Sequence, residues 1–376
     1  MNSAGMSLRR KARLLILKGS KTLGLFRISQ ALTRKKLRIL CYHNFALADV
    51  PEWEKLLTMD ARIFEERMAY LAEHGHTVLG LDEGVDGLDT GALPDLPTVI
   101  TIDDGWFNIK RHAHGILKRH EFPYTIYVSS HYSRHQVPLF NISIQYLFEM
   151  TRKRTVELDG LNLPFDANVD LSDEASTEEI KDRIIDYGHT QLNPQERRDF
   201  LLRAAELLEV DFRPLDYERA YHFVSASEIR ELVADGVDIQ MHAYRHVWPM
   251  DRERALKELA DDRAYLEPLV GKTLHHFCYP SGIYDKSQFP FLSEAKVKSA
   301  TTCESGFNDA DTHKFALKRF LDSDDIHALE FEAEMAGYLE LMRKLRNPLR
   351  ELTALMADLP RLPDALRPER NRRAPA

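Results

Sequence analysis

Two pairs of residues have the types and the spacing of a catalytic metal site. Asp103 and Asp104 stand side by side after an apolar run, and adjacent carboxylates at a strand end repel each other unless a cation or a proton lies beside them. His242 and His246 are four positions apart, so both imidazoles can converge on one metal ion. Each pair also has a non-catalytic interpretation. Asp-Gly is a common turn, so the aspartates fit an acidic turn after a strand. The chain has 16 histidines, so His242 and His246 also fit two surface histidines.

A carboxylate with two imidazoles leaves one coordination position for water. Such a set suits Zn²⁺, although Co²⁺, Ni²⁺ or Mn²⁺ accept the same ligands. A divalent metal lowers the pKa of bound water towards ~7 and polarises a carbonyl oxygen. A second carboxylate beside it can accept the proton of that water as a general base. The four residues together therefore indicate metal-assisted hydrolysis.

Three further segments place polar residues at the ends of predicted strands. Tyr279-Pro280-Ser281-Gly282 predicts a rigid turn that can aim a backbone N–H at a developing oxyanion. His43 can protonate a leaving amine, and Arg319 can pair with a site carboxylate and hold it ionised. A plain turn, a structural histidine and a solvated arginine are the alternatives. Cys278 fits a small buried residue better than a nucleophile.

The elements that must position these residues alternate between short apolar runs and helical patterns. This alternation predicts an α/β fold with parallel strands, open or closed into a barrel. The predicted strands are Leu37–Tyr42, Thr77–Leu81, Thr98–Ile102, Tyr124–Val128, Val237–Met241, His275–Tyr279, Ser299–Thr302 and Phe315–Phe320. The candidate residues follow several of these strands, and the carboxyl ends of parallel strands are where such folds place their sites.

One region interrupts the alternation. Between residues 131 and 221 the strand signal nearly vanishes, and the patterns Asn141–Thr151, Thr177–Tyr187 and Asn193–Leu208 are helical. We therefore expect a helical insertion on the barrel rim. Helices are also predicted at Asp60–His74 and at Met250–Val270, the latter ended by Gly271.

The motifs resemble those of the metal-dependent polysaccharide deacetylases of the NodB-homology type, carbohydrate esterase family 4, over residues 37–325. The family motif T-F-D-D-G stands here as Thr101–Gly105, and H-[ST]-x-x-H stands as His242–His246. Ala243 replaces the usual hydroxyl residue, so a hydrogen bond that orients this loop is missing. The third motif has no Arg before Pro280.

In that third motif and in Tyr42-His43 the chain is similar to the biofilm-polysaccharide deacetylases, where the corresponding histidine is the general acid. The family's late motif, Leu followed by His, is absent, and Arg319 stands in this segment. The resemblance implies a distorted (β/α) barrel of about seven strands (the NodB-homology fold) with a helical insertion. It also implies residue roles: Asp103 as general base, His43 as general acid, Asp104, His242 and His246 as metal ligands, and Ser281, Pro280, Tyr279 and Arg319 around the oxyanion and substrate.

The reaction implied by the resemblance removes an N-acetyl group from an amino sugar of a surface polysaccharide or of its lipid-linked precursor. Two alternatives remain. One is an O-acetyl esterase or deformylase on a glycan, which needs the same ligands. The other is a non-catalytic carbohydrate-binding protein on the same fold, suggested by Ala243 and the missing arginine.

Charge is distributed unevenly along the 376 residues. Residues 1–40 hold eleven Lys or Arg and no acid, whereas the whole chain carries −8. The apolar run Leu14–Leu17 is too short for a signal peptide, which predicts a cytoplasmic protein. Residues 6–36 predict one or two amphipathic helices, interrupted at Gly19 and Gly24, that either pack on the protein itself or lie on the inner face of the membrane.

Composition limits the remaining possibilities. Three cysteines exclude a disulfide scaffold, and the net negative charge gives no support to a nucleic-acid partner. We expect a basic N-terminal segment at 1–36, a barrel at 37–330, C-terminal helices at 331–359 and a disordered tail at 360–376.

Overall fold

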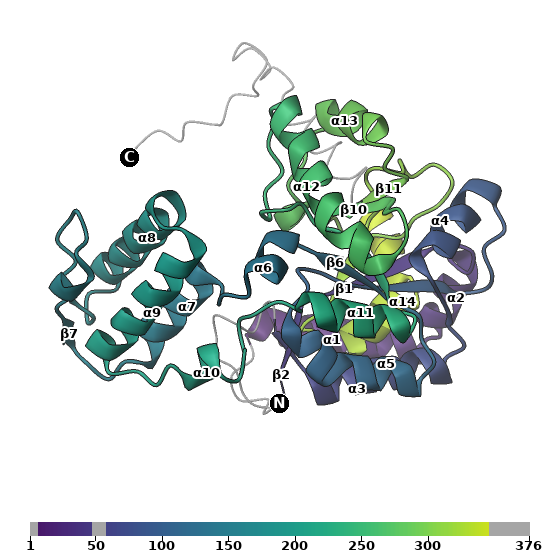
Figure 1. The fold of residues 1–376 in the computed structure, drawn as a ribbon. Helices are drawn as coiled ribbons and strands as arrows, with labels where there is room; N and C mark the ends of the chain where they lie inside the picture. The colour runs from purple at the N-terminus through teal and green to yellow at the C-terminus, as the bar shows by residue number, and fades with distance from the viewer. Residues whose placement is uncertain (1–6, 47–57, 346–376) are drawn as a thin grey trace, which may run out of the picture. The chain divides into compact units, whose positions relative to one another are not determined.

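The computed structural model describes residues 7–46 and 58–345, which form two compact units (Figure 1). The larger unit is Thr33–Phe331, and the smaller joins Met1–Leu32 to Glu332–Ala376. The predicted tail at 360–376 and the end of the C-terminal helical region lie outside the described residues. Within the described ranges, no helix is long and apolar enough to cross a membrane.

A parallel sheet forms the centre of the larger unit. Its strand order is β11-β10-β9-β6-β5-β1-β12, and β4 also pairs with β5. The strands are β1 (Arg38–Tyr42), β4 (Thr77–Leu79), β5 (Pro97–Ile102), β6 (Thr125–Val128), β9 (Asp238–Met241), β10 (His276–Cys278), β11 (Ser299–Thr301) and β12 (Phe320–Leu321). Every residue of β1 and β5 is buried, because helices and the barrel interior cover both faces of a parallel sheet.

The last strand closes this sheet into a distorted barrel. Leu317 bridges Thr301 at the end of β11, and three residues later Phe320 pairs with Leu40 of β1. The predicted barrel of about seven strands is thereby confirmed. The continuous strand predicted at Phe315–Phe320 is wrong, because this segment crosses from one neighbour to the other and keeps regular pairing only at Phe320–Leu321.

Helices surround the barrel (Figure 1). They are α3 (Ala61–Glu73), α4 (Leu81–Thr90), the π-helical turn Ile109–Ala113 with α5 (His114–Arg119), α11 (Ala226–Ala234), α12 (Arg252–Val270), α13 (Phe289–Glu294) and α14 (Ala328–Met335). The predicted end of α12 is confirmed by Gly271, whose φ of 77° is left-handed. A short parallel pair, β2 (Asn44–Ala46) with β3 (Thr58–Asp60), has no counterpart in the predicted strands.

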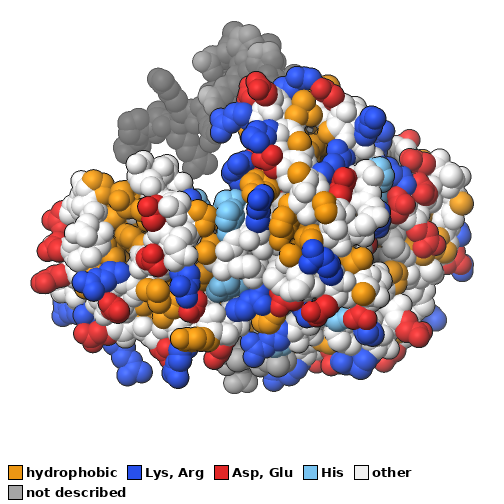
Figure 2. Space-filling model, in the orientation of Figure 1, with side chains coloured by type: hydrophobic (Ala, Val, Ile, Leu, Met, Phe, Trp, Pro, Cys, Tyr) orange, Lys and Arg blue, Asp and Glu red, His pale blue; other side chains and the backbone are white. Residues whose placement is uncertain are grey.

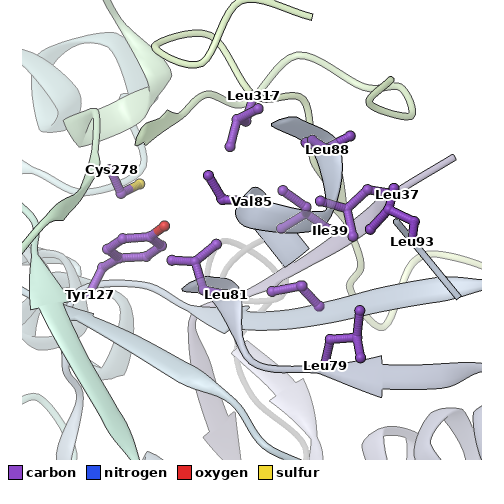
Figure 3. Close-up of a cluster of buried hydrophobic side chains, with 11 residues drawn as sticks. Leu37, Ile39, Leu79, Leu81, Val85, Leu88, Leu93, Tyr127, Cys278 and Leu317 are labelled. Carbon is purple, nitrogen blue, oxygen red and sulfur yellow. The ribbon is translucent and has the colours of Figure 1, made fainter. Parts of the chain in front are cut away.

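The helix α4 was not predicted because its sequence contains Gly84 and Gly87, which weaken a helix. The structure explains both glycines by close packing. A Cβ at Gly84 would lie 2.8 Å from Val99, and one at Gly87 would lie 2.5 Å from Leu93. Figure 3 shows the apolar cluster that these contacts belong to, with Leu81, Val85 and Leu88 of α4 among its members.

The helical insertion leaves the barrel after β6 and returns before α11 (Figure 1). It contains α6 (Ser130–His135), α7 (Phe140–Met150), α8 (Glu174–Gln191), α9 (Pro194–Leu208), α10 (Arg213–Asp216) and a small antiparallel pair, β7 (Thr155–Val156) with β8 (Val169–Asp170). Asn193 and Glu196 cap α9 reciprocally, as their spacing indicates. α8 is longer at both ends than the Thr177–Tyr187 pattern.

The smaller unit begins with α1 (Leu8–Thr22) and α2 (Leu25–Leu32). The expected interruption at Gly19 is absent, because α1 continues through it, whereas Gly24 lies between the two helices with φ of 76°. Residues 338–345 are helical as well. Within this unit Phe26 contacts Tyr338, with the ring centroids 5.2 Å apart, and Ser20 Oγ lies 2.9 Å from the Tyr338 hydroxyl.

Candidate active site

Asp104, His242 and His246 form a compact group of candidate metal ligands at the carboxyl ends of β5 and β9. Asp104 Oδ1 lies 3.2 Å from His242 Nε2 and 3.3 Å from His246 Nε2. One ligand atom from each residue falls within 4.8 Å of the others. Burial opposes ionisation of Asp104, but the two imidazoles outweigh it and hold the pKa of Asp104 well below its usual range. The carboxylate is therefore ionised, as a metal ligand must be.

Neighbouring groups fix the orientation of these ligands. His242 Nδ1 lies 2.9 Å from the carbonyl oxygen of Cys278. Since that oxygen can only accept, Nδ1 carries a proton, which leaves Nε2 as the nitrogen that could bind a metal. Trp106 Nε1 donates to Asp104 Oδ2 at 2.8 Å, which leaves Oδ1 facing the histidines. The donor set thus fits a divalent metal such as Zn²⁺.

The loops that carry the site contain several residues with a strained backbone. Four non-glycine residues here have a left-handed backbone: Asp104, Ala243, His246 and Ser281, with φ of 70°, 60°, 59° and 54°. Such conformations cost on the order of 1–3 kcal/mol each and persist where the surroundings enforce them. Ala243 is fully buried, so the position where the family has a hydroxyl residue is here an apolar one.

Asp103 forms a buried, two-pronged ion pair with Arg319. Arg319 Nη1 lies 2.7 Å from Oδ1, and Nη2 lies 2.8 Å from Oδ2. Burial alone would raise the pKa of Asp103, but Arg319 outweighs it and holds that pKa far below the usual range. Arg319 also donates to the Thr302 carbonyl at 2.8 Å. The pairing with a site carboxylate that the sequence left open is thus present in the structure.

Two cysteines complete the surroundings of Asp103. Cys41 Sγ and Cys278 Sγ lie 3.5 and 3.4 Å from Asp103 Oδ2. Both are buried, and burial raises the pKa of the Cys41 thiol well above its usual value. The burial of Cys278 agrees with its interpretation as a small buried residue.

His43 faces Asp103 from the end of β1. Its Nε2 lies 3.8 Å from Asp103 Oδ2, and 15% of its side chain is exposed. Burial lowers the pKa of His43 below its usual value, although Asp103 and Asp104 oppose this effect. The imidazole is thus brought to the same space as the carboxylates, as its position after a strand indicates.

The turn after β10 carries Tyr279, Pro280 and Ser281. Tyr279 and Pro280 are buried, and Ser281 is exposed. The Tyr279 hydroxyl donates to the Phe315 carbonyl at 2.9 Å, and its ring stacks on Tyr284 with centroids 4.9 Å apart. Tyr279 is held from both sides, so the structure gives it a part in fixing the turn.

A cavity of about 220 Å³ adjoins Asp104 and His246. The barrel contributes Trp106, Phe223, Arg245 and Val247 to its wall, and the insertion contributes Tyr132, Leu139, Asn141, Ile142 and His189. In Figure 2, histidine side chains reach the surface in the recess between the insertion and the barrel. Sequence reasoning missed Trp106 and this wall. For Trp106 the only signal was its place directly after Gly105.

Comparison with known proteins agrees with this geometry. A family model described as polysaccharide deacetylase matches residues 200–300, a stretch that contains both histidine ligands and the turn after β10. No curated protein matches the chain.

Several solved structures share the fold. The Streptococcus pyogenes deacetylase PplD is 14% identical with a TM-score of 0.53, and the match covers 81% of this chain and 99% of that one. IcaB from Ammonifex degensii is 17% identical with a TM-score of 0.51, covering 80% and 97%. A de-N-acetylase from Aggregatibacter actinomycetemcomitans is 12% identical with a TM-score of 0.51, covering 80% and 99%. Over residues 200–300 the chain matches the polysaccharide deacetylase model, and its fold is similar to that of these solved deacetylases, in agreement with the motif residues at its strand ends.

Proposed function

We propose that the protein is a metal-dependent hydrolase that removes the N-acetyl group from an amino sugar of a surface polysaccharide or of its lipid-linked precursor. The observation that carries the proposal is the group Asp104, His242 and His246 beside the ion-paired Asp103. In this proposal Asp104, His242 and His246 hold the metal. A divalent ion there supplies an activated water and polarises the amide carbonyl.

Asp103 is the proposed general base. Arg319 occupies one lone pair on each carboxylate oxygen, and an ionised carboxylate offers about four such sites. The remaining lone pairs can accept the proton of the attacking water. Because its pKa is so low, Asp103 binds that proton weakly and passes it on readily.

His43 is the proposed general acid. Its Nε2 lies 3.8 Å from Asp103 Oδ2, so a proton taken up by Asp103 has a short path to the imidazole. In this proposal His43 then protonates the departing amine. The exposed Ser281 is proposed to donate its backbone N–H to the developing oxyanion, with Tyr279 and Pro280 holding the turn.

The similar deacetylase PplD was solved in complex with acetate, the product that our proposal expects here. Zn²⁺ is the proposed ion, with Co²⁺, Ni²⁺ or Mn²⁺ as substitutes. An O-acetyl esterase or deformylase would use the same groups, and only a comparison of substrates separates it from an N-deacetylase.

The test combines metal analysis with hydrolysis of N-acetylated glucosamine oligomers, followed by detection of the free amine. We expect about one divalent ion per chain in the wild type, lost in His242→Ala and kept in the control His275→Ala, whose histidine is exposed. Asp103→Asn should keep the ion and lose roughly 10²–10⁴-fold in kcat. Absence of metal after reconstitution, or of any deacylation, would favour the non-catalytic glycan-binding alternative.

We further propose that the substrate is reached in the cytoplasm, at the inner face of the membrane. The eleven basic residues in 1–40 support this placement, because the cytoplasmic leaflet carries anionic lipids.

A further inference from the structure

The outward face of α1 is apolar and its inward face contains polar residues. Leu8, Leu15, Ile16 and Leu23 have exposed fractions of 86%, 73%, 64% and 76%. Their spacing of 7, 1 and 7 puts them on one side of the helix, within an arc of about 100°. On the other side, Leu17 and also the polar Ser20 are buried.

α2 repeats this arrangement. Ile28 and Leu32, four positions apart, are 57% and 66% exposed, whereas Phe26 and the polar Ser29 are buried. A helix on the surface of a protein in water normally has the opposite polarity. We call Leu8, Leu15, Ile16, Leu23, Ile28 and Leu32 the apolar stripe. An exposed apolar surface of this kind marks a contact with a membrane or another protein.

The inward side of these helices is already occupied. Phe26 packs on Tyr338, Ser20 bonds to the same residue, and Lys21 forms an ion pair with Glu332. Among the described residues of the smaller unit, these contacts lie on the inward side of the helices and leave the apolar stripe exposed.

Cations border the apolar stripe. Arg9, Lys11 and Lys18 of α1 are exposed and lie on its two flanks by helical position. α1 has no acidic residue in its first turn, and none occurs anywhere in residues 1–40. Long basic side chains beside an apolar face can reach anionic headgroups while their stems stay in the apolar layer.

We propose that the apolar stripe lies in the interface of an anionic lipid bilayer, with Arg9, Lys11 and Lys18 at the level of the headgroups. The helix α1 has 15 residues and is about 22 Å long, so it fits along the plane of the interface. A second copy of the chain is a poorer occupant, because the same cations would face each other across the contact. This inference specifies the surface for the proposed membrane placement and does not depend on the hydrolytic activity.

The test is sedimentation of the full chain with vesicles of phosphatidylcholine, with and without roughly one-third phosphatidylglycerol. We expect the wild type to sediment with the anionic vesicles and to be released as salt is raised well above about 0.1 M. The triple variant with Leu15→Ser, Ile16→Ser and Leu23→Ser should bind the anionic vesicles at least about tenfold more weakly than the wild type does. The variant Arg9→Glu, Lys11→Glu, Lys18→Glu should lose the preference for anionic lipid.

The matched control replaces Tyr217 and Met250 by Ser, since these apolar residues are 81% and 61% exposed but lie in the larger unit. It should bind as the wild type does. The proposal is overturned if the wild type stays in the supernatant, or if the triple-serine variant binds equally well. A two-chain mass in light scattering without vesicle binding would assign the stripe to a second copy. Hydrolysis of a soluble substrate, measured in each variant, separates failure of this surface from failure of the proposed activity.

Discussion

Arg319 sets the charge of Asp103, and with it the pH range in which a carboxylate base can act. Both nitrogens at the end of the guanidinium are used, one on each oxygen. Lysine cannot reproduce this paired geometry, because its ammonium group is a single point charge. Replacing Arg319 by Lys therefore keeps the positive charge and removes the paired geometry.

We predict that Arg319→Lys raises the pKa of Asp103 towards its usual value. A carboxylate base works only when it is ionised. As the pH is lowered, the activity of the variant should therefore fall at a higher pH than the activity of the wild type does. The measurement is kcat/KM against pH, with metal content checked in parallel. Arg198→Lys is the control, because Arg198 also pairs with an aspartate, Asp216, and both residues lie in the insertion. The prediction would be contradicted if kcat/KM of Arg319→Lys and of the wild type fell at the same pH on the acidic side of the profile.

Trp106 orients Asp104, the proposed carboxylate ligand, through one hydrogen bond. We predict that Trp106→Phe, which keeps a ring but removes the donor to Asp104, weakens metal binding by about 10–100-fold. Competition with a chelator measures this affinity. Trp248→Phe is a matched control, since Trp248 Nε1 is buried without a hydrogen-bond partner among the described residues. Equal affinities in the two variants would show that the bond has no such role.

At the scale of elements, the end of β12 contains a second buried carboxylate. Burial raises the pKa of Asp322 to about 6, although Arg67 at 3.0 Å opposes the rise. A pKa higher in the folded than in the unfolded chain stabilises the fold fully below about pH 4, and this contribution is lost as the pH rises through about 6. The difference corresponds to about 3 kcal/mol.

We predict that the free energy of unfolding includes this loss between about pH 4 and pH 6, and that Asp322→Asn removes it. Urea unfolding at a series of pH values measures the slope. The absolute stability of the variant is also expected to fall, because Arg67 loses its charged partner. Asp216→Asn, which removes a more exposed Arg–Asp pair, should keep the wild-type slope.

The elements themselves were largely predictable. Buried parallel strands are continuous apolar runs, which identified β1, β5 and β6 to within a residue. The crossing of the last strand was not predictable. Nothing in the sequence of Phe315–Phe320 indicates that Leu317 pairs with β11 whereas Phe320 pairs with β1. Nor does the local sequence of α4 reveal that Gly84 packs against Val99 and Leu37.

The candidate site shows the same division. That Asp104, His242 and His246 lie close together could be predicted from their spacing, because they follow the ends of two strands of one parallel sheet. The bond from Trp106 could not, since a tryptophan after a turn most often packs in a core. Nor could the cavity wall, whose insertion residues are brought to the metal ligands only by tertiary structure.

At the scale of the whole molecule, the insertion and the barrel share one cavity. Asn141 and His189 line it from α7 and α8, and between these helices Gly188 packs against Phe140. A Cβ at Gly188 would lie 2.0 Å from the Phe140 ring, which is too close for any side chain. The spacing of the two helices, and with it the cavity wall, depends on this glycine.

We predict that Gly188→Ala raises KM for a glycan substrate several-fold, while metal content and kcat stay near wild type. Overpacking of this kind typically costs about 1–3 kcal/mol and displaces the neighbours Asn141 and His189. Steady-state kinetics and thermal unfolding are the measurements. Gly115→Ala in α5 is the control, because a Cβ at Gly115 would have only the far end of Arg119 within 4 Å. It should leave KM and the thermal unfolding unchanged. An unaltered KM in Gly188→Ala would show that this cavity wall takes no part in substrate binding.

The strand that closes the barrel also delivers Arg319, and this has a consequence during synthesis. Asp103 and Arg319 are 216 positions apart. At about 5–20 residues per second, a ribosome needs roughly 10 to 40 s to pass from one to the other. Throughout that interval Asp103 lacks the guanidinium that it pairs with in the folded protein, and β1 lacks its partner β12. Fragments truncated before β12 should therefore lack both the ion pair and the closed barrel.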